Sequence, residues 1–224
     1  MPILKIDAVI FDMDGVITDT MPYHYRAWKK VYAGEGLLVE ECEVYLREGQ
    51  PGHRMIRQIF REHGKVFHEG LAKRMLEQKE RIFKRIVRPV FVPGARAFLR
   101  HLRGKNIRTA LVTGTARHEV HKILQGDFLD RFDAIVTGDE VKHGKPNPEP
   151  FLTALKKLKI RPDEAVVVEN APFGIFSAKK ARLKCIALET YLDRAYLKDA
   201  DYIVSSFRDL RKRLDFETLK TRGR

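Results

Sequence analysis

The sequence has few cysteines and no long apolar run. Only Cys42 and Cys185 occur among its 224 residues, and a lone distant pair forms neither a disulfide framework nor a cysteine-rich zinc site. No apolar stretch reaches the roughly 18 residues that a membrane span requires. The first residues lack the basic segment, apolar stretch and cleavage site of an export signal. These absences argue against secretion and membrane insertion, and they predict a reduced, cytoplasmic protein without a membrane partner.

Uncharged polar side chains are also scarce, with four glutamines and three asparagines against 43 Lys and Arg and 30 Asp and Glu. This bias is typical of proteins from hot environments, so thermophily is a hypothesis. The net charge of +13 suits an anionic partner such as a phosphorylated metabolite. The basic residues are scattered except over 208–224, where acidic residues interrupt them. A solvated basic surface is therefore favoured over nucleic-acid binding.

Hydrophobic residues make up 44% of the chain and charged residues 33%, which is the composition of a folded domain. Apolar residues at successive rather than alternate positions predict strands that are covered on both faces. Helical patterns lie between most of these runs, as in a parallel sheet wound on both sides. We predict an α/β fold with a doubly wound, Rossmann-like parallel sheet, whose strands are 8–11, 109–112, 134–136, 165–168, 185–188 and 202–204.

The first interval between strands is much longer than the others. Apolar residues at helical spacing predict helices at about 21–33, 51–63, 69–88 and 94–103. We therefore predict two parts. A Rossmann-like core consists of 1–18 and 91–224, and an all-helical cap of 19–90 is inserted into it.

Two carboxylates, Asp12 and Asp14, follow the first predicted strand, and Gly15 lets the backbone turn away from them. Ligands of doubly wound sheets bind at the carboxyl ends of the strands. Two like charges at one place require a counterion, and Mg²⁺ suits carboxylate and carbonyl oxygens. An Asx-rich turn remains the alternative explanation for this fragment alone.

Three later strands end in groups that suit phosphate or metal. Thr113 and Gly114 offer a hydroxyl and a backbone amide to an anion. Lys145 offers an ammonium in a loop that prolines stiffen, and Glu169 and Asn170 offer two oxygen ligands. Each has a plain alternative by itself: a turn threonine, a surface lysine or an acid at a strand end. Their order along one sheet predicts a combined phosphate and Mg²⁺ site.

This order of side chains resembles the four motifs of the haloacid-dehalogenase superfamily of phosphotransferases, over almost the whole chain. Within it, the segments 12–20 and 23–28 look like the beta-phosphoglucomutase branch, which also contains many sugar-phosphate phosphatases. The inserted helices are similar to that family's small helical cap. The residues that carry the resemblance are Asp12, Asp14, Thr113, Lys145, Glu169 and Asn170.

The resemblance implies a mechanism. Asp12 attacks phosphorus and forms an aspartyl-phosphate, while Asp14 is the general acid and then the general base, with a pKa expected to be raised in the closed state. Thr113 and Lys145 complete the catalytic set by holding phosphoryl oxygens. Mg²⁺ is held by Asp12, Asp14 and the pair 169–170. The implied substrate-binding residues are Gly114, Thr20, His24, Gly49 and Arg54.

Two departures from the branch matter. Asn170 stands where an acidic residue is usual, so Glu169 is expected to be the principal ligand and Asn170 a weaker one. The mutase pattern has a lysine immediately before Gly49 and an arginine three residues after it, whereas this chain has Glu48 and Gly52. Because a mutase must hold a second phosphate with positioned cations, their absence favours a phosphatase.

Other cap residues permit two interpretations. The resemblance implies that His24 orients Asp14, although a packed or exposed histidine is the alternative. Arg54 is displaced from the arginine of the mutase pattern. Lys73 and Lys79 could contribute to substrate binding, but solvated helix charges are the favoured interpretation.

We therefore predict a Mg²⁺-dependent phosphatase that hydrolyses a small phosphate monoester, a sugar phosphate in particular, and acts as a monomer. A beta-phosphoglucomutase is the alternative. A phosphometabolite-binding protein with weak catalysis is a remote alternative that Asn170 supports. A dehalogenase is disfavoured, because its chemistry needs neither Mg²⁺ nor an acid at the position of Asp14.

Overall fold

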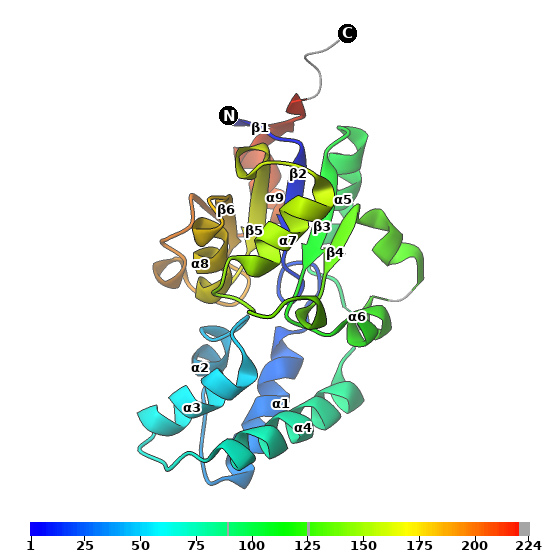
Figure 1. Cartoon of the computed structure of the whole chain (residues 1–224). Helices are drawn as coiled ribbons and strands as arrows, with labels where there is room; N and C mark the ends of the chain where they lie inside the picture. The colour runs from blue at the N-terminus through cyan, green and yellow to red at the C-terminus, as the bar shows by residue number, and fades with distance from the viewer. Residues whose placement is uncertain (89, 125, 220–224) are drawn as a thin grey trace.

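The core of the molecule is a six-stranded parallel sheet. The computed structural model describes residues 1–88, 90–124 and 126–219 (Figure 1). The strand order is β4-β3-β2-β5-β6-β7, and every neighbouring pair is parallel. All six predicted strands are confirmed. They are β2 Ala8–Phe11, β3 Arg108–Val112, β4 Ala134–Val136, β5 Ala165–Glu169, β6 Lys184–Leu188 and β7 Tyr202–Val204.

Strand β2 lies in the middle of this sheet and determines where ligands bind. Its four residues are all buried, and Phe11 lies opposite Leu111 on β3 and Val168 on β5. The strand order reverses here, because the chain first adds β3 on one side of β2 and later adds β5 on the other. Such a switch point opens a crevice at the carboxyl ends of the strands.

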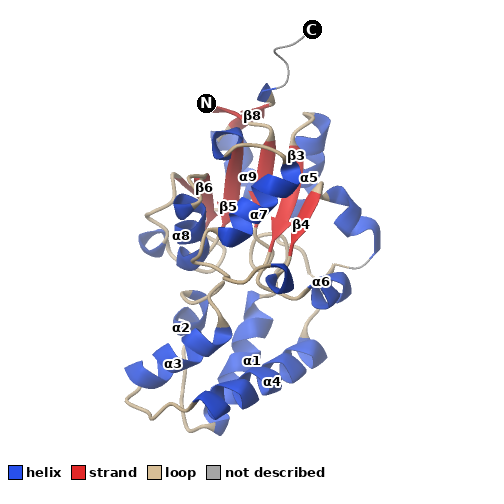
Figure 2. Cartoon of the chain, viewed as in Figure 1, coloured by secondary structure: helices blue, strands red, loops and turns tan. Residues whose placement is uncertain are grey.

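Helices cover both faces of the sheet (Figure 2). Alternate residues of β2 enter opposite apolar clusters, with Ile10 in one and Phe11 in the other, as the two-residue period of a strand requires. Helices α7 and α8 pack on one face, and α5 and α9 on the other. The helices of the core are α5 Ala95–Gly104, α6 Arg117–Ile123, α7 Glu149–Leu158, α8 Pro172–Lys180 and α9 Phe207–Arg213.

Four helices between β2 and α5 form a layer beyond the carboxyl end of the sheet, shown at the bottom of Figure 1. We call α1–α4 the helical insertion. Helix α4 packs along α1 and α3. The helices expected at 21–33, 51–63 and 69–88 are confirmed with small shifts in their ends, and α2 was not predicted. The four helices are α1 Met21–Gly34, α2 Glu41–Tyr45, α3 Gly52–Glu62 and α4 Glu69–Ile86.

A second, two-stranded sheet joins the beginning of the chain to its end. Strand β1, Ile3–Lys5, pairs in parallel with β8, Asp215–Glu217. The Lys105 ammonium supports β8 by donating to the Phe216 carbonyl at 3.0 Å. The basic stretch at 208–224 thus contains a helix and a strand, and its last residues, 220–224, lie outside the described ones. Within the described ranges, no helix combines the length and hydrophobicity needed to cross a membrane.

Candidate active site

The ends of β2 and β5 bring three charged side chains into contact. The Lys145 Nζ lies 2.5 Å from Asp12 Oδ1 and 2.7 Å from Glu169 Oε1. Lys145 reaches them from the loop before α7, and the Asp12 amide is anchored on the Val168 carbonyl at 3.0 Å. All three charged residues are buried. The structure therefore brings together residues that lie far apart in the sequence, as the sheet topology led us to expect.

One ammonium serves two buried carboxylates in this cluster. Burial raises the pKa of Asp12 well above its usual range, and the charges of Glu169 and Asp14 raise it further while Lys145 opposes them. Burial alone would lower the pKa of Lys145, but the charges of Asp12 and Glu169 outweigh it and raise this pKa. The excess of negative charge favours binding of a further cation beside Asp12.

The residues around this cluster fit Mg²⁺. The side-chain oxygen Oδ1 of Asn170 is buried and has no hydrogen-bond partner among the residues that the structure describes, although a buried amide oxygen normally has one. Glu169 Oε2 accepts a hydrogen bond from the backbone amide of Asn170 at 2.9 Å. Gly15, at φ +82°, packs so closely that a Cβ would lie 2.1 Å from Asn170 Nδ2. Carboxylate, amide and main-chain oxygens are the donors that Mg²⁺ prefers, so this set could hold the ion.

Asp14 faces the helical insertion. Thr20 donates its hydroxyl to Asp14 Oδ1, and the His24 Nε2 lies 3.2 Å from the same oxygen. The Lys79 Nζ in turn lies 2.9 Å from His24 Nδ1. Burial favours a raised pKa for Asp14, but the His24 charge, the hydrogen bonds from His24 and Thr20, and the Lys79 charge together lower it. The insertion thus surrounds Asp14 with cationic and donor groups, and the rise in this pKa that is expected in the closed state stays a prediction.

Lys79 lies in the cavity wall, so its interpretation as a solvated helix charge was wrong. Its ammonium lies 4.7 Å from the centre of the Phe83 ring and 5.8 Å from that of Trp28. Burial lowers its pKa, against the opposing charges of nearby carboxylates. A signal was present in the sequence. Met75 lies four residues before Lys79, and Phe83 lies four residues after it. Lys79 therefore lies within the apolar stripe of α4.

A cavity of about 350 Å³ lies between the sheet and the insertion, and Asp12, Asp14, Thr113 and Gly114 line it. The Thr113 hydroxyl accepts a hydrogen bond from the Thr115 amide at 3.1 Å, which holds the loop after β3 in a tight turn. A Cβ on Gly114 would meet nothing within 4 Å, so its backbone borders open space. These residues could hold phosphoryl oxygens beside Asp12.

The other predicted residues of the cap fall into three groups. His24 and Gly49 line the cavity, and Gly49, at φ +84°, lies against Lys145, whose Cδ would be 3.2 Å from a Cβ there. Thr20 is buried and contacts Asp14 instead of lining the cavity. Arg54 is exposed on α3 and is absent from the cavity wall, so the structure does not bring it to the site. The missed Arg47 lines the wall.

Arg47 is not available as a free cation. It is buried, it pairs with the Glu62 carboxylate, and it donates to the Glu43 carbonyl at 2.6 Å. Arg47 lies in the loop between α2 and α3, and the residues of this loop show neither helical nor strand periodicity. The sequence therefore contained no signal for its position.

A parallel α/β sheet with carboxylates and a lysine at its switch point, under a helical insertion, defines a class of phosphate-handling hydrolases. The family model described as haloacid dehalogenase-like hydrolase matches residues 6–182. The chain belongs to this family, as its sequence motifs indicated.

Relatives of known name agree with this assignment. A phosphorylated carbohydrates phosphatase of Thermotoga maritima is 35% identical over 188 residues, which are 81% of this chain and 84% of that protein. A fructose-1-phosphate phosphatase of Escherichia coli is 30% identical, over 80% of this chain and 94% of that one. The solved beta-phosphoglucomutase of Clostridium difficile is 29% identical, with a TM-score of 0.76, and covers 92% of this chain and 93% of its own. The expected class, a phosphoric monoester hydrolase of this family, is confirmed.

Proposed function

We propose that this protein is a Mg²⁺-dependent phosphatase that hydrolyses a small phosphate monoester through an aspartyl-phosphate. The observation that carries the proposal is the buried contact of Lys145 with Asp12 and Glu169 at 2.5 and 2.7 Å, with Asp14 lining the same cavity. This cluster combines a nucleophile, an acid–base group and a fixed positive charge beside space for a phosphate.

In the first step, an oxygen of Asp12 forms a bond to phosphorus while the ester P–O bond breaks. Asp14 gives its proton to the departing alkoxide oxygen. Lys145, Thr113 and the Gly114 amide hold the other phosphoryl oxygens. Mg²⁺ would be held by Asp12, the main-chain carbonyl of Asp14, Glu169 and Asn170. When bound, it would neutralise negative charge on the transferred phosphoryl group.

In the second step, water attacks phosphorus, Asp14 removes its proton, and the bond between phosphorus and Asp12 breaks. Asp14 must therefore start protonated, although its pKa is lowered in the free protein. The incoming phosphate brings negative charge close to Asp14, and a nearby like charge raises the pKa of a carboxyl group. Substrate binding thus favours the protonated form that the first step requires.

We further propose that the molecule is organised as a core of 1–18 and 91–224 with a cap of 19–90, and that the cap excludes water from the cavity. The shared cavity wall supports this division, since Asp12 belongs to the core and His24 to the cap. We propose a monomer, because all the groups named in the two steps come from one chain. We propose that it lies in the cytoplasm, because Cys42 and Cys185 are both free, as a reducing compartment keeps them.

We propose a sugar phosphate as the substrate. The relatives whose names specify phosphorylated carbohydrates and fructose 1-phosphate support this choice, and a cavity of about 350 Å³ suits a ligand of that size.

A beta-phosphoglucomutase is the second candidate, because the solved enzyme of that name covers 92% of this chain. A mutase would convert beta-glucose 1-phosphate into glucose 6-phosphate, whereas a phosphatase would release inorganic phosphate. Incubation with beta-glucose 1-phosphate and measurement of both products separates the two.

The test of the phosphatase is hydrolysis of para-nitrophenyl phosphate with and without Mg²⁺. Asp12→Asn should reduce the rate by at least about a thousandfold, as loss of a covalent nucleophile does in other enzymes, and removal of Mg²⁺ should abolish it. Asp193→Asn is the matched control, because Asp193 is exposed and lies outside the cavity wall, and it should leave the rate unchanged. Retention of most activity by Asp12→Asn would contradict the proposed nucleophile.

A further inference from the structure

Part of the wall of this cavity is acidic. Glu48 in the loop after α2, Glu80 on α4 and Glu119 on α6 line the same cavity as the catalytic carboxylates. A substrate whose phosphate lies beside Asp12 shares the cavity with these three residues, because all of them line it. The charge of this wall therefore bears on which substrates fit.

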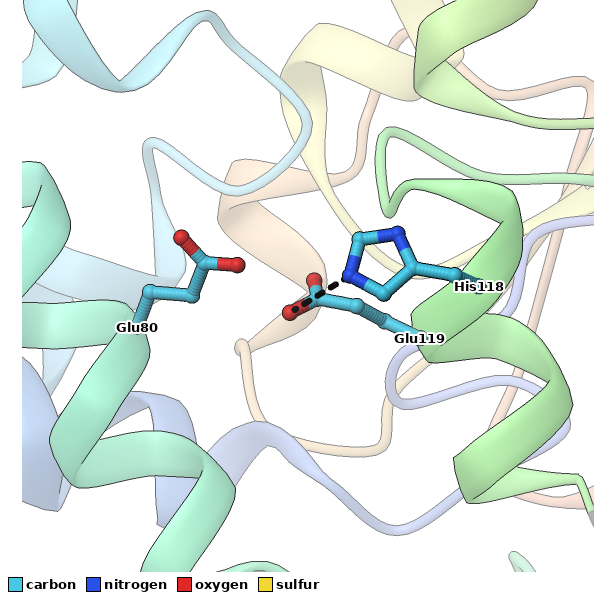
Figure 3. A group of neighbouring side chains, drawn as sticks. All are labelled: Glu80, His118 and Glu119. Carbon is cyan, nitrogen blue, oxygen red and sulfur yellow. Dashed lines mark ion pairs between the residues drawn. The ribbon is translucent and has the colours of Figure 1, made fainter.

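Glu80 and Glu119 are already neutralised in part. Figure 3 shows Glu80 pointing from α4 toward Glu119 and His118 on α6, and possible ligand atoms of the three lie within 4.8 Å of one another. The Lys84 ammonium lies 2.6 Å from Glu80 and 2.9 Å from Glu119. These two carboxylates therefore share one cation, and we assign no metal to them.

Glu48 differs from this pair. It is half-buried, and in the ranges that the structure describes its carboxylate makes no hydrogen bond and no ion pair, while its backbone amide donates to the Tyr45 carbonyl at 3.3 Å. It is the carboxylate with the largest effect in raising the pKa of Lys79, so its charge acts within the cavity. An unpaired carboxylate in a cavity wall is available to accept hydrogen bonds from a ligand.

The cations beside these carboxylates do not match their number. The Lys79 ammonium contacts His24 and lies near Asp14 as well as the three glutamates, and Arg47 pairs with Glu62. Among the described residues, Glu48, Glu80 and Glu119 are thus opposed by Lys79, which also serves Asp14, and by Lys84, which pairs with Glu80 and Glu119. A second phosphate or a carboxylate on the substrate would meet net negative charge there, and like charges in a partly desolvated site repel.

We propose that Glu48 is a specificity-determining residue, which accepts hydroxyl groups of the substrate and rejects a second anionic group. The substrate class is then a monophosphate whose remaining part is uncharged and rich in hydroxyl groups, such as a sugar or polyol. This inference rests on the proposed phosphatase function and narrows it.

The test compares two esters that differ in one group. Glycerol 3-phosphate carries a hydroxymethyl group where 3-phosphoglycerate carries a carboxylate. The wild-type enzyme should have the higher kcat/KM for glycerol 3-phosphate. In Glu48→Gln this preference should fall on the order of tenfold, mainly through a lower KM for 3-phosphoglycerate, because one like charge near the ligand is removed. Glu48→Lys should lower the preference further.

The control is Glu77→Gln, which removes the same charge from an exposed position of α4 outside the cavity wall and should leave the preference unchanged. Hydrolysis of para-nitrophenyl phosphate is measured in parallel. If all variants hydrolyse it and the preference does not change in either Glu48 variant, the inference is wrong while the phosphatase stands. If the wild-type protein hydrolyses none of the three esters, the proposed function fails and the inference with it.

Discussion

Replacement of Lys145 by methionine should destabilise the protein strongly in the absence of divalent ions. The change leaves Asp12 and Glu169 buried without the ammonium that lies 2.5 and 2.7 Å from them. Removal of one partner from a buried charge cluster costs about 3–5 kcal/mol in free energy of unfolding. Methionine keeps the length and much of the volume of the side chain beside the Phe151 ring, which lies 5.2 Å from the ammonium, so the loss measures charge more than packing.

The size of this loss should depend on pH. The pKa of Asp12 is already raised by burial and by Glu169 and Asp14, and removal of Lys145 raises it further. A carboxyl group whose pKa is higher in the folded than in the unfolded state does not reduce the free energy of unfolding at pH values below its unfolded pKa of about 4. Its destabilising effect grows as the pH rises from there toward the pKa in the folded state. The variant should therefore lose more stability at pH 8 than at pH 5.

Urea denaturation of both proteins at the two pH values, with EDTA, measures the loss. The control is Lys157→Met, in which an exposed ammonium 3.0 Å from Glu140 is removed at a cost below about 1 kcal/mol. Excess Mg²⁺ should restore part of the stability of Lys145→Met, since the ion binds the folded state. A loss below about 1 kcal/mol at pH 8, or one that is equal at both pH values, would refute the reasoning.

Four further outcomes are expected. Glu169→Gln should raise the Mg²⁺ concentration for half-maximal phosphatase activity about tenfold or more, and an unchanged titration would place the ion elsewhere. Gly15→Ala should lower the denaturation midpoint, because φ is +82° and a Cβ would lie 2.1 Å from Asn170 Nδ2; an unaltered midpoint contradicts the close packing. Lys79→Met removes a charge that lowers the pKa of Asp14, so the limb of the pH–rate profile that Asp14 sets should move to higher pH. A thermal midpoint below about 60 °C would weigh against thermophily.

The sequence predicted the main sheet because its strands are continuous apolar runs. Such runs stand out from helical periodicity, and all six were placed within a residue at each end. Strands β1 and β8 were missed, since three residues show no period and their pairing joins Ile3 to Asp215. Helix α2 has only five residues, which is also too short for a helical pattern to appear.

The cluster of Asp12, Lys145 and Glu169 was predictable for a different reason. In a parallel sheet, residues that follow neighbouring strands meet at one edge, so the sequence alone predicted that Asp12 and Glu169 lie together. Contacts between the insertion and the core follow no such rule. Lys79 was misread for another reason: lysines are mostly exposed, and its position in the apolar stripe of α4 was outweighed by that general tendency. Arg54 was misplaced because α3 turns its apolar side, including Ile56, inward, so that Arg54 points outward.

The position of β2 has a consequence for biosynthesis. The segment with Asp12 leaves the ribosome early, yet β2 needs β3 on one side and β5 on the other. The pocket floor cannot assemble until Glu169 has been translated, whereas the inserted helices can collapse on one another beforehand. A nascent chain arrested before β5 would display a fully apolar strand with one edge unpaired, and it should depend on chaperones at that stage.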